Sequence, residues 1–301
     1  MHAYEYFLAH QPAVTGFFDS TTNTVSYVVA DEDAKRCAVT DSVLDYEPHG
    51  ATLSYESAEK LVAFIRAREY IVDWILETHV HADHLSAAPY LKERLGGRIA
   101  IGEHILEVQE VFGKAFNEGT EFERDGRQFD RLFRDGDEFS VGSIPARVIY
   151  TPGHTPADVT YVIGDAVFSG DTLFMPDYGT ARVDFPGGSA EDMHASVQKL
   201  FALPEEMRMF IGHDYLPGGR AEYRYETTIG EQKRTNVHLS AQTSSATFAV
   251  LRKERDATLG MPRLIIPSIQ VNMRAGNLPQ DTDTGIPVLK TPVNGIFSKR
   301  R

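Results

Sequence analysis

The chain has 301 residues, of which 42% are hydrophobic and 24% charged, and its formal net charge is -13. This length suits one large domain or two modest ones, and the composition is that of a folded protein rather than a disordered one. The acidic balance argues against a protein that binds nucleic acid, because such proteins cluster Lys and Arg against the phosphates.

The first third of the chain alternates strands and helices. Hydrophobic periodicity and turn residues predict these elements in order: a strand pair at 24–30 and 37–40, an amphipathic helix at 54–68, a buried strand at 70–77, a helix at 86–95 and a strand at 98–101. The only cysteine, Cys37, lies within a predicted strand, so we expect a small buried side chain and no disulfide.

The rest of the chain is richer in strands. Residues 103–135 are expected to be mostly helical or irregular. The further elements are strands at 146–150, 159–163 and 166–168, a helix from Ser189, a short strand at 209–212, polar helical sequence beyond Tyr215 and a C-terminal tail at 281–301. Together they indicate a mixed α/β protein in which helices flank two sheets.

The ends of the chain give no targeting or membrane signal. The first residues lack the basic start and apolar run of a signal peptide. No window reaches the ~18 consecutive apolar residues of a membrane span. We therefore expect a soluble, cytoplasmic protein that does not bind membranes.

A dense group of polar side chains follows the predicted strand at 70–77. His79, His81, Asp83 and His84 lie within six residues, where a strand ends and a helix begins. Alternation along an extended chain puts His79 and His81 on the same side. Imidazole and carboxylate ligands at this density suit a divalent ion such as zinc or iron, so the cluster predicts a metal site.

Three later residues repeat this pattern one at a time. His154, Asp171 and His213 each follow a predicted strand, beside a glycine that permits close approach of the backbone. A single histidine after a strand is weak evidence. In combination with the first cluster, the three residues favour a metal-dependent enzyme.

These residues identify a resemblance to the metallo-β-lactamase superfamily. The segment Thr78–His84 carries its His-x-His-x-Asp-His signature, and His154, Asp171 and His213 match its later ligands. The resemblance covers about residues 14–275. It implies an αββα sandwich, with the metal site between the sheets at one edge. We accordingly expect a catalytic domain at 1–280 followed by the tail.

Further segments resemble the persulfide dioxygenases, which are relatives of glyoxalase II. They are 182–185, 213–215, 231–236 and 272–276. This resemblance implies oxidation of glutathione persulfide by O2 to sulfite and glutathione, with one Fe(II) per chain held by His79, His154 and Asp171. The remaining motif residues would then surround the iron site or stay without a metal: His81, Asp83, His84 and His213.

The chemistry of these residues is compatible with a second function. Two histidines and one carboxylate form the facial triad of ferrous oxygenases, which leaves positions for dioxygen and a sulfur ligand. Seven ligands would equally hold two Zn, Fe or Mn ions, as a thioester hydrolase of the glyoxalase II type requires. A metal sensor without catalytic activity is a third possibility, and open coordination positions disfavour it.

Other residues are candidates for the substrate and for support of the site. Lys233, Arg234, Asn272 and Arg274 offer cationic or amide groups for the carboxylates of glutathione. Tyr215 is a candidate hydrogen-bond donor near the metal. We expect Arg182 and Asp184 to pair beside the site, and Asp41 resembles a supporting carboxylate of the superfamily. Relatives of this kind imply a homodimer or higher homo-oligomer.

Overall fold

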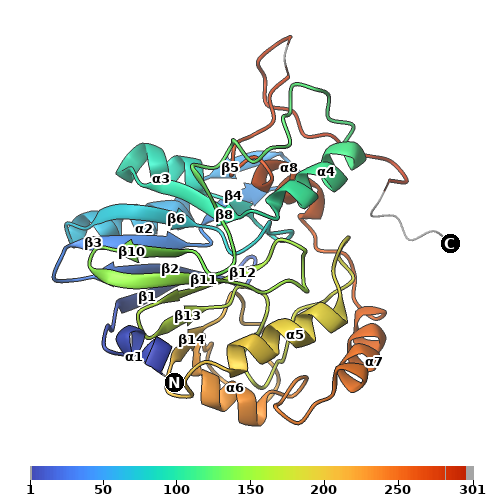
Figure 1. Ribbon diagram of the computed structural model, residues 1–301. Helices are drawn as coiled ribbons and strands as arrows, with labels where there is room; N and C mark the ends of the chain where they lie inside the picture. Colours follow the sequence, from blue (N-terminus) through green and yellow to red (C-terminus); the bar gives the residue numbers. More distant parts are fainter. Residues whose placement is uncertain (1, 282, 296–301) are drawn as a thin grey trace.

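The structure, a computed structural model, describes residues 2–281 and 283–295. Two β-sheets lie face to face, and helices cover the outer face of each (Figure 1). The chain therefore has the αββα architecture that the sequence predicts.

The first sheet has the strand order β1-β2-β3-β6-β8-β9. Its strands are β1 (Ala13–Asp19), β2 (Thr24–Asp31), β3 (Arg36–Thr40), β6 (Ile71–Leu76), β8 (Arg98–Gly102) and β9 (Arg131–Phe133). From β3 to β9 neighbouring strands are parallel, so their carboxyl ends share one edge of the sheet. That edge carries the histidine cluster.

The second sheet has the order β10-β11-β12-β13-β14-β15. Its strands are β10 (Glu138–Val141), β11 (Ile144–Tyr150), β12 (Val159–Ile163), β13 (Ala166–Phe168), β14 (Arg208–Phe210) and β15 (Glu226–Thr228). Only β13 and β14 pair in parallel; the other pairs are antiparallel. A small third sheet is formed by β4 (Val43–Glu47), β5 (Thr52–Ser54) and β7 (Leu85–Ser86).

Eight helices complete the described part of the chain. They are α1 (His2–Leu8), α2 (Glu56–Ala67), α3 (Ala88–Leu95), α4 (Ile105–Ala115), α5 (Ala190–Phe201), α6 (Ile229–Thr235), α7 (Ser245–Asp256) and α8 (Ile265–Asn272). In Figure 1, α2, α3, α4 and α8 lie on the side of the first sheet, and α1, α5, α6 and α7 on the side of the second. Within the described ranges, no helix is long and apolar enough to cross a membrane.

A cluster of buried apolar side chains fills the space between the sheets, including Tyr27, Trp74 and Tyr161. Hydrogen bonds also cross this space. The Tyr161 hydroxyl donates to the carbonyl oxygen of Glu77 at 2.9 Å, and the Trp74 indole donates to that of Ser140 at 2.9 Å. Because Glu77 directly precedes the histidine cluster, the first bond fixes that cluster relative to the second sheet.

Most of the predicted elements are confirmed within a few residues. The helix predicted at 54–68 is α2, which buries Ala58, Leu61, Val62 and Ile65, and Cys37 is fully buried in β3. The start of the helix predicted at 86–95 is wrong. Residues 85–86 pair with β4 instead, and Pro89 lies in the first turn of the helix, which begins at Ala88. The predicted strand at 209–212 ends at Phe210.

The expected tail at 281–301 is partly described, and residues 282 and 296–301 lie outside the described ranges. Gln280 forms an isolated antiparallel bridge with Pro287. The backbone N–H of Lys290 donates to Oε1 of Gln270 in α8 at 2.8 Å, and its ammonium group pairs with Glu118 at 2.8 Å. The described part of the tail therefore contacts the body of the protein.

Candidate metal centre

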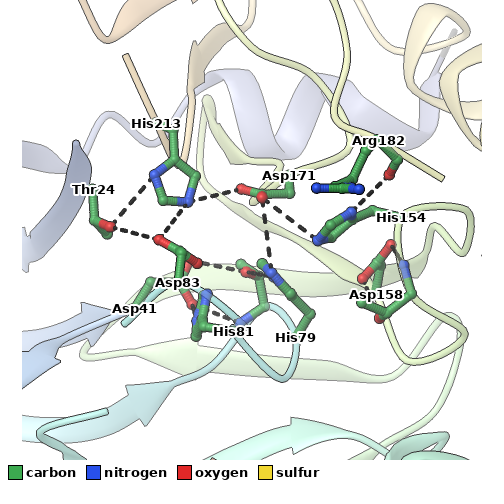
Figure 2. Close-up of polar contacts among 12 residues, drawn as sticks. Thr24, Asp41, His79, His81, Asp83, His154, Asp158, Asp171, Arg182 and His213 are labelled. Carbon is green, nitrogen blue, oxygen red and sulfur yellow. Dashed lines mark hydrogen bonds and ion pairs between the residues drawn. The ribbon is translucent and has the colours of Figure 1, made fainter. Parts of the chain in front are cut away.

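Every predicted ligand lies just beyond the carboxyl end of a strand. The cluster at 79–84 follows β6, whereas His154, Asp171 and His213 follow β11, β13 and β14. The ligands from the two sheets thus meet at one edge of the sandwich, and Figure 2 shows the labelled side chains pointing toward one another. Their side chains are at most 9% exposed, apart from that of Asp83 at 25%.

A first ligand set consists of His79, His154 and Asp171. Oδ2 of Asp171 lies 4.0 Å from Nε2 of His79 and 3.7 Å from Nε2 of His154 (Figure 2). One ligand atom from each residue lies within 4.8 Å of the others. Three donor atoms at this separation can surround one divalent ion.

Hydrogen bonds set the orientation of both histidines in this set. Nδ1 of His79 lies 3.0 Å from the Thr78 hydroxyl, which itself donates to Asp41 at 2.9 Å. Nδ1 of His154 donates to the carbonyl oxygen of Arg182 at 2.8 Å. Because each Nδ1 faces an acceptor, it carries the proton, and the lone pair of Nε2 faces Asp171.

Electrostatics keeps His79 neutral. Burial, followed by the neighbouring His81 and His154, holds the pKa of His79 well below its usual range. A neutral imidazole is the form that binds a metal ion.

A second ligand set adjoins the first. It contains Asp83 and His84, which group with His81 within 4.8 Å, and His213, which lies beside Asp171 of the first set. Nε2 of His213 lies 3.3 Å from Oδ1 of Asp171 and 3.5 Å from Oδ2 of Asp83. Asp171 therefore faces both sets, one through each carboxylate oxygen.

His81 is held by two buried carboxylates. Its Nε2 lies 3.0 Å from Asp41 and 3.1 Å from Glu77. Although burial opposes the charge, Asp41 and Glu77 raise the pKa of His81 well above its usual value. Asp41, whose own backbone φ is 48°, also accepts a hydrogen bond from the backbone N–H of Thr78 at 2.8 Å. The predicted supporting position of Asp41 thus corresponds to direct contacts with the cluster.

The donor chemistry of the centre fits metal ions. Among the described residues, four buried ligand atoms of the centre have no hydrogen-bond partner: His79 Nε2, His81 Nδ1, His84 Nε2 and Asp171 Oδ1. An unpaired buried polar atom costs about 1–3 kcal/mol. Bound cations would satisfy the atoms of His79, His84 and Asp171, and the nitrogen and oxygen donors suit zinc, iron or manganese.

A cavity of about 350 Å³ opens beside the first ligand set. His154 and Asp171 form part of its wall, while Arg182, Arg255 and Arg263 bring positive charge to it. Its apolar side is formed by Phe174, Leu259, Pro262 and Leu264. The cavity therefore suits a ligand that combines anionic groups with an apolar or sulfur-containing part.

Tyr215 lines the same cavity. Its ring stacks on the imidazole of His213, with centroids 5.7 Å apart, and on Tyr178 at 4.9 Å. Although the residue is 39% exposed, desolvation of the hydroxyl at the cavity, followed by the charges of Asp171 and Asp83, raises its pKa above the usual value. The hydroxyl therefore keeps its proton and is available as a donor.

Arg182 and Asp184 form a two-pronged ion pair at 2.5 and 2.8 Å beside the cavity. The Arg182 guanidinium also donates to the carbonyl oxygen of Gly260 at 2.6 Å. This pair fixes the segment whose backbone carbonyl holds His154. The side chain of Arg182 lies at the cavity, and its backbone carbonyl orients the candidate metal ligand His154.

The structure places the four residues predicted for substrate binding outside the cavity lining. Lys233 and Arg234 pair with Glu205 at 3.2 and 2.9 Å. The amide of Asn272 donates to the backbone oxygens of His81 and His84 at 2.9 and 2.8 Å. Arg274 is buried against Glu118 at 3.0 Å. Asn272 thus supports the histidine loop from α8.

Several residues at the site were not predicted from the sequence. Arg255 and Arg263 line the cavity because the end of α7 and the loop after it fold over the ligand sets. Nothing in the local sequence places that loop, which is far from the motif along the chain. The position of Glu77 could have been interpreted from the sequence. A carboxylate at the end of a buried strand needs a polar partner, and the adjacent histidines of the metal motif could supply one.

The fold and the site define a metalloenzyme that gathers histidine and aspartate ligands between two sheets. The chain belongs to the metallo-beta-lactamase superfamily, whose family model matches residues 20–213. A probable metallo-hydrolase of Burkholderia pseudomallei is 51% identical over 94% of this chain and 99% of its own length. A beta-lactamase hydrolase-like protein of Xylella fastidiosa is 50% identical; the match covers 95% of this chain and 65% of that protein.

Two matches bear on the predicted dioxygenase family. The persulfide dioxygenase of Homo sapiens is 26% identical over 86% of this chain and 87% of its own length. The crystal structure of ETHE1 from Myxococcus xanthus has a TM-score of 0.70 and 28% identity, covering 88% of this chain and all of that one. The chain is thus similar both to proteins named as hydrolases and to a persulfide dioxygenase.

Proposed function

We propose that this protein is a persulfide dioxygenase that holds one Fe(II) with His79, His154 and Asp171. Its substrates would be glutathione persulfide, O2 and water, and its products glutathione and sulfite. The observation that carries the proposal is the group of two histidines and one carboxylate whose ligand atoms lie within 4.8 Å of one another, with His154 and Asp171 on the cavity wall. The likeness to the human persulfide dioxygenase supports it.

The ligand residues are prepared for this role before any metal binds. The Nε2 atoms of His79 and His154 both face Asp171 with their lone pairs free to bind a metal ion, and Asp171 supplies a negative charge. Bound ferrous iron would supply the redox chemistry that lets dioxygen react with sulfur. The protein contributes by keeping the remaining side of the set open to the cavity.

We expect the cavity wall to bind the peptide part of glutathione. Glutathione carries two carboxylates, and Arg255 and Arg263 are exposed guanidinium groups on the lining. Arginine binds carboxylates through paired hydrogen bonds. With the carboxylates held there, the sulfur end would lie toward His154 and Asp171, where the Tyr215 hydroxyl can donate to it.

Oxygen consumption tests this function. Metal-free protein is loaded anaerobically with Fe(II), and O2 uptake and sulfite are measured after addition of glutathione persulfide. We expect one O2 consumed per sulfite formed, with activity that Zn(II) does not restore. Iron-loaded protein that consumes no O2 and forms no sulfite would contradict the proposal.

A thioester hydrolase with two metal ions is the second candidate. The unpaired atom His84 Nε2 favours it, because a second metal ion would satisfy a ligand atom that one iron leaves without a partner. Several relatives are also named as hydrolases. Near two metal ions per chain, together with hydrolysis of a glutathione thioester and no O2 uptake, would establish this candidate instead.

The setting of the reaction is also part of the proposal. We expect the protein to act in the cytoplasm as a homodimer or higher homo-oligomer. Analytical ultracentrifugation checks the assembly, and a monomer at micromolar concentration would contradict it.

A further inference from the structure

The peptide group that joins Arg182 to Val183 is hydrogen-bonded through both of its polar atoms. Its carbonyl oxygen accepts the proton of His154 Nδ1 at 2.8 Å, and its N–H donates to Oδ2 of Asp256 at 2.9 Å. Figure 2 shows the Arg182 carbonyl facing the imidazole. One planar group thus connects a carboxylate at the end of α7 with a candidate metal ligand.

Asp256 is firmly held at this position. It is 4% exposed, and its other carboxylate oxygen pairs with the guanidinium of Arg252, which is 1% exposed. Arg252 also donates to the carbonyl oxygen of Thr180 at 3.1 Å. A buried carboxylate with a buried partner cannot turn away without leaving a charge uncompensated. Its acceptor oxygen therefore stays aimed at Val183.

We propose that Asp256 is a positioning residue for His154 and acts through the 182–183 peptide group. A carboxylate that accepts the N–H polarises the peptide and makes its carbonyl oxygen a stronger acceptor. The carbonyl then holds the proton of His154 on Nδ1 and turns the Nε2 lone pair toward Asp171. Metal-binding histidines commonly donate to a carboxylate or to a carbonyl; here the carboxylate reinforces the carbonyl. The inference holds for one metal ion or for two.

A purely structural role of the Arg252–Asp256 pair is the alternative, and two double variants separate it. R252M/D256L replaces the ion pair with apolar side chains and leaves the Val183 N–H without its acceptor. R252Q/D256N also removes both charges but keeps an amide oxygen that can accept from Val183. The two variants therefore differ mainly in the hydrogen bond that the proposal requires.

Nitrogen NMR of the histidine rings in metal-free protein provides a readout that is independent of activity. We expect the His154 Nδ1–H signal in the wild type and in R252Q/D256N, and its loss or exchange broadening in R252M/D256L. The His79 Nδ1–H, which faces Thr78, is the internal control and should stay unchanged. Zn²⁺ affinity, measured by competition with a chelator, should fall about tenfold or more in R252M/D256L and much less in R252Q/D256N.

A wild-type His154 signal and wild-type Zn²⁺ affinity in R252M/D256L would overturn the proposal. Equal losses in both double variants would also overturn it, because they would assign the effect to packing. If R252M/D256L does not fold, R252Q/D256L takes its place, because it differs from R252Q/D256N only in lacking the acceptor at position 256. An unchanged Zn²⁺ affinity in folded R252Q/D256L would contradict the proposed role.

Discussion

Asp158 is a buried carboxyl group that supports the metal centre without belonging to either ligand set. It accepts the Thr155 N–H at 2.8 Å and also the Thr155 hydroxyl, and so shapes the turn that carries His154. Burial raises its pKa to about 6. The native state therefore binds this proton more tightly than the unfolded chain does.

This shift predicts a pH-dependent effect of the substitution Asp158→Asn. Because the native pKa is raised, folding stability in the wild type falls as pH rises from about 4 to about 6. The amide of the variant cannot titrate, so the free energy of unfolding of D158N relative to the wild type should increase by up to about 3 kcal/mol between pH 4 and pH 7. Urea denaturation of metal-free protein measures it, and a difference that is constant over this range would contradict the assignment.

At the residue scale, the ligand types could be predicted but their orientations could not. The positions of His79, His154 and Asp171 after strands could be inferred from local sequence. The choice of nitrogen depends on Thr78 and on the Arg182 carbonyl, and the latter comes from a distant segment. The ion pairs of Lys233 and Arg234 with Glu205 were not predictable for the same reason, because only the fold brings Glu205 beside them.

At the scale of elements, the strand ends approach each other so closely that one position requires glycine. Gly170, between β13 and Asp171, has φ of 49°. A Cβ atom there would lie 2.4 Å from the Thr78 hydroxyl oxygen and 2.7 Å from the Thr78 Cβ. Thr78 is the residue that orients His79, so this contact joins the loops of the two sheets at the ligands.

We therefore expect Gly170→Ala to disturb both folding and metal binding. Backbone strain and overpacking should cost about 1–3 kcal/mol of stability each. Displacement of Thr78 should lower metal affinity as well. Gly218→Ala is the control, because nothing lies within 4 Å of the added Cβ. Urea denaturation and metal titration of both variants check the expectation, which fails if they behave alike.

Helix α7 contributes the cavity cation Arg255, and its charge should appear in substrate binding. If the proposed substrate is correct, Arg255→Gln should raise KM for glutathione persulfide about tenfold and change kcat little, since Arg255 would contact the carboxylates and not the sulfur. Lys253→Gln removes a neighbouring exposed charge that does not line the cavity, and it should leave KM unchanged. Initial rates of O2 uptake test the pair; equal KM values in both variants would remove Arg255 from the binding site.

Elements with strong periodicity were predictable, whereas short strands were not. The helix α2 and the strand β6 follow from their apolar patterns. The two-residue strand β7 is defined by its pairing with β4, and sequence before Ala88 carries no periodic signal for it. The loop after α7 is likewise positioned by tertiary contacts, including the bond from Arg182 to Gly260.

At the scale of the whole molecule, the metal centre connects the two sheets. His79 comes from the first sheet, whereas His154 and Asp171 come from the second. A bound cation should therefore stabilise the native state, by about 2.7 kcal/mol at a hundredfold excess over Kd. Metal removal should lower the Tm of the wild type but not that of His154→Gln. A Tm that is independent of metal in both proteins would contradict a centre that joins the sheets.

The sandwich itself was predictable because its motif residues follow strands in a fixed order, and the resemblance supplied the layering. The number of metal ions was not predictable, since both ligand sets are complete in the sequence. The structure retains both sets, with Asp171 between them. The central claim is therefore that only the first set is needed for the reaction.

Oxygen uptake by the iron-loaded wild type, His154→Gln and His84→Gln tests this claim most directly. His154 belongs to the first set and His84 to the second. One Fe(II) held by the first set predicts uptake with glutathione persulfide in the wild type, a loss of about 100-fold or more in His154→Gln, and a rate within a few-fold of wild type in His84→Gln. Equal losses in the two variants, or a wild type that consumes no oxygen, would contradict it.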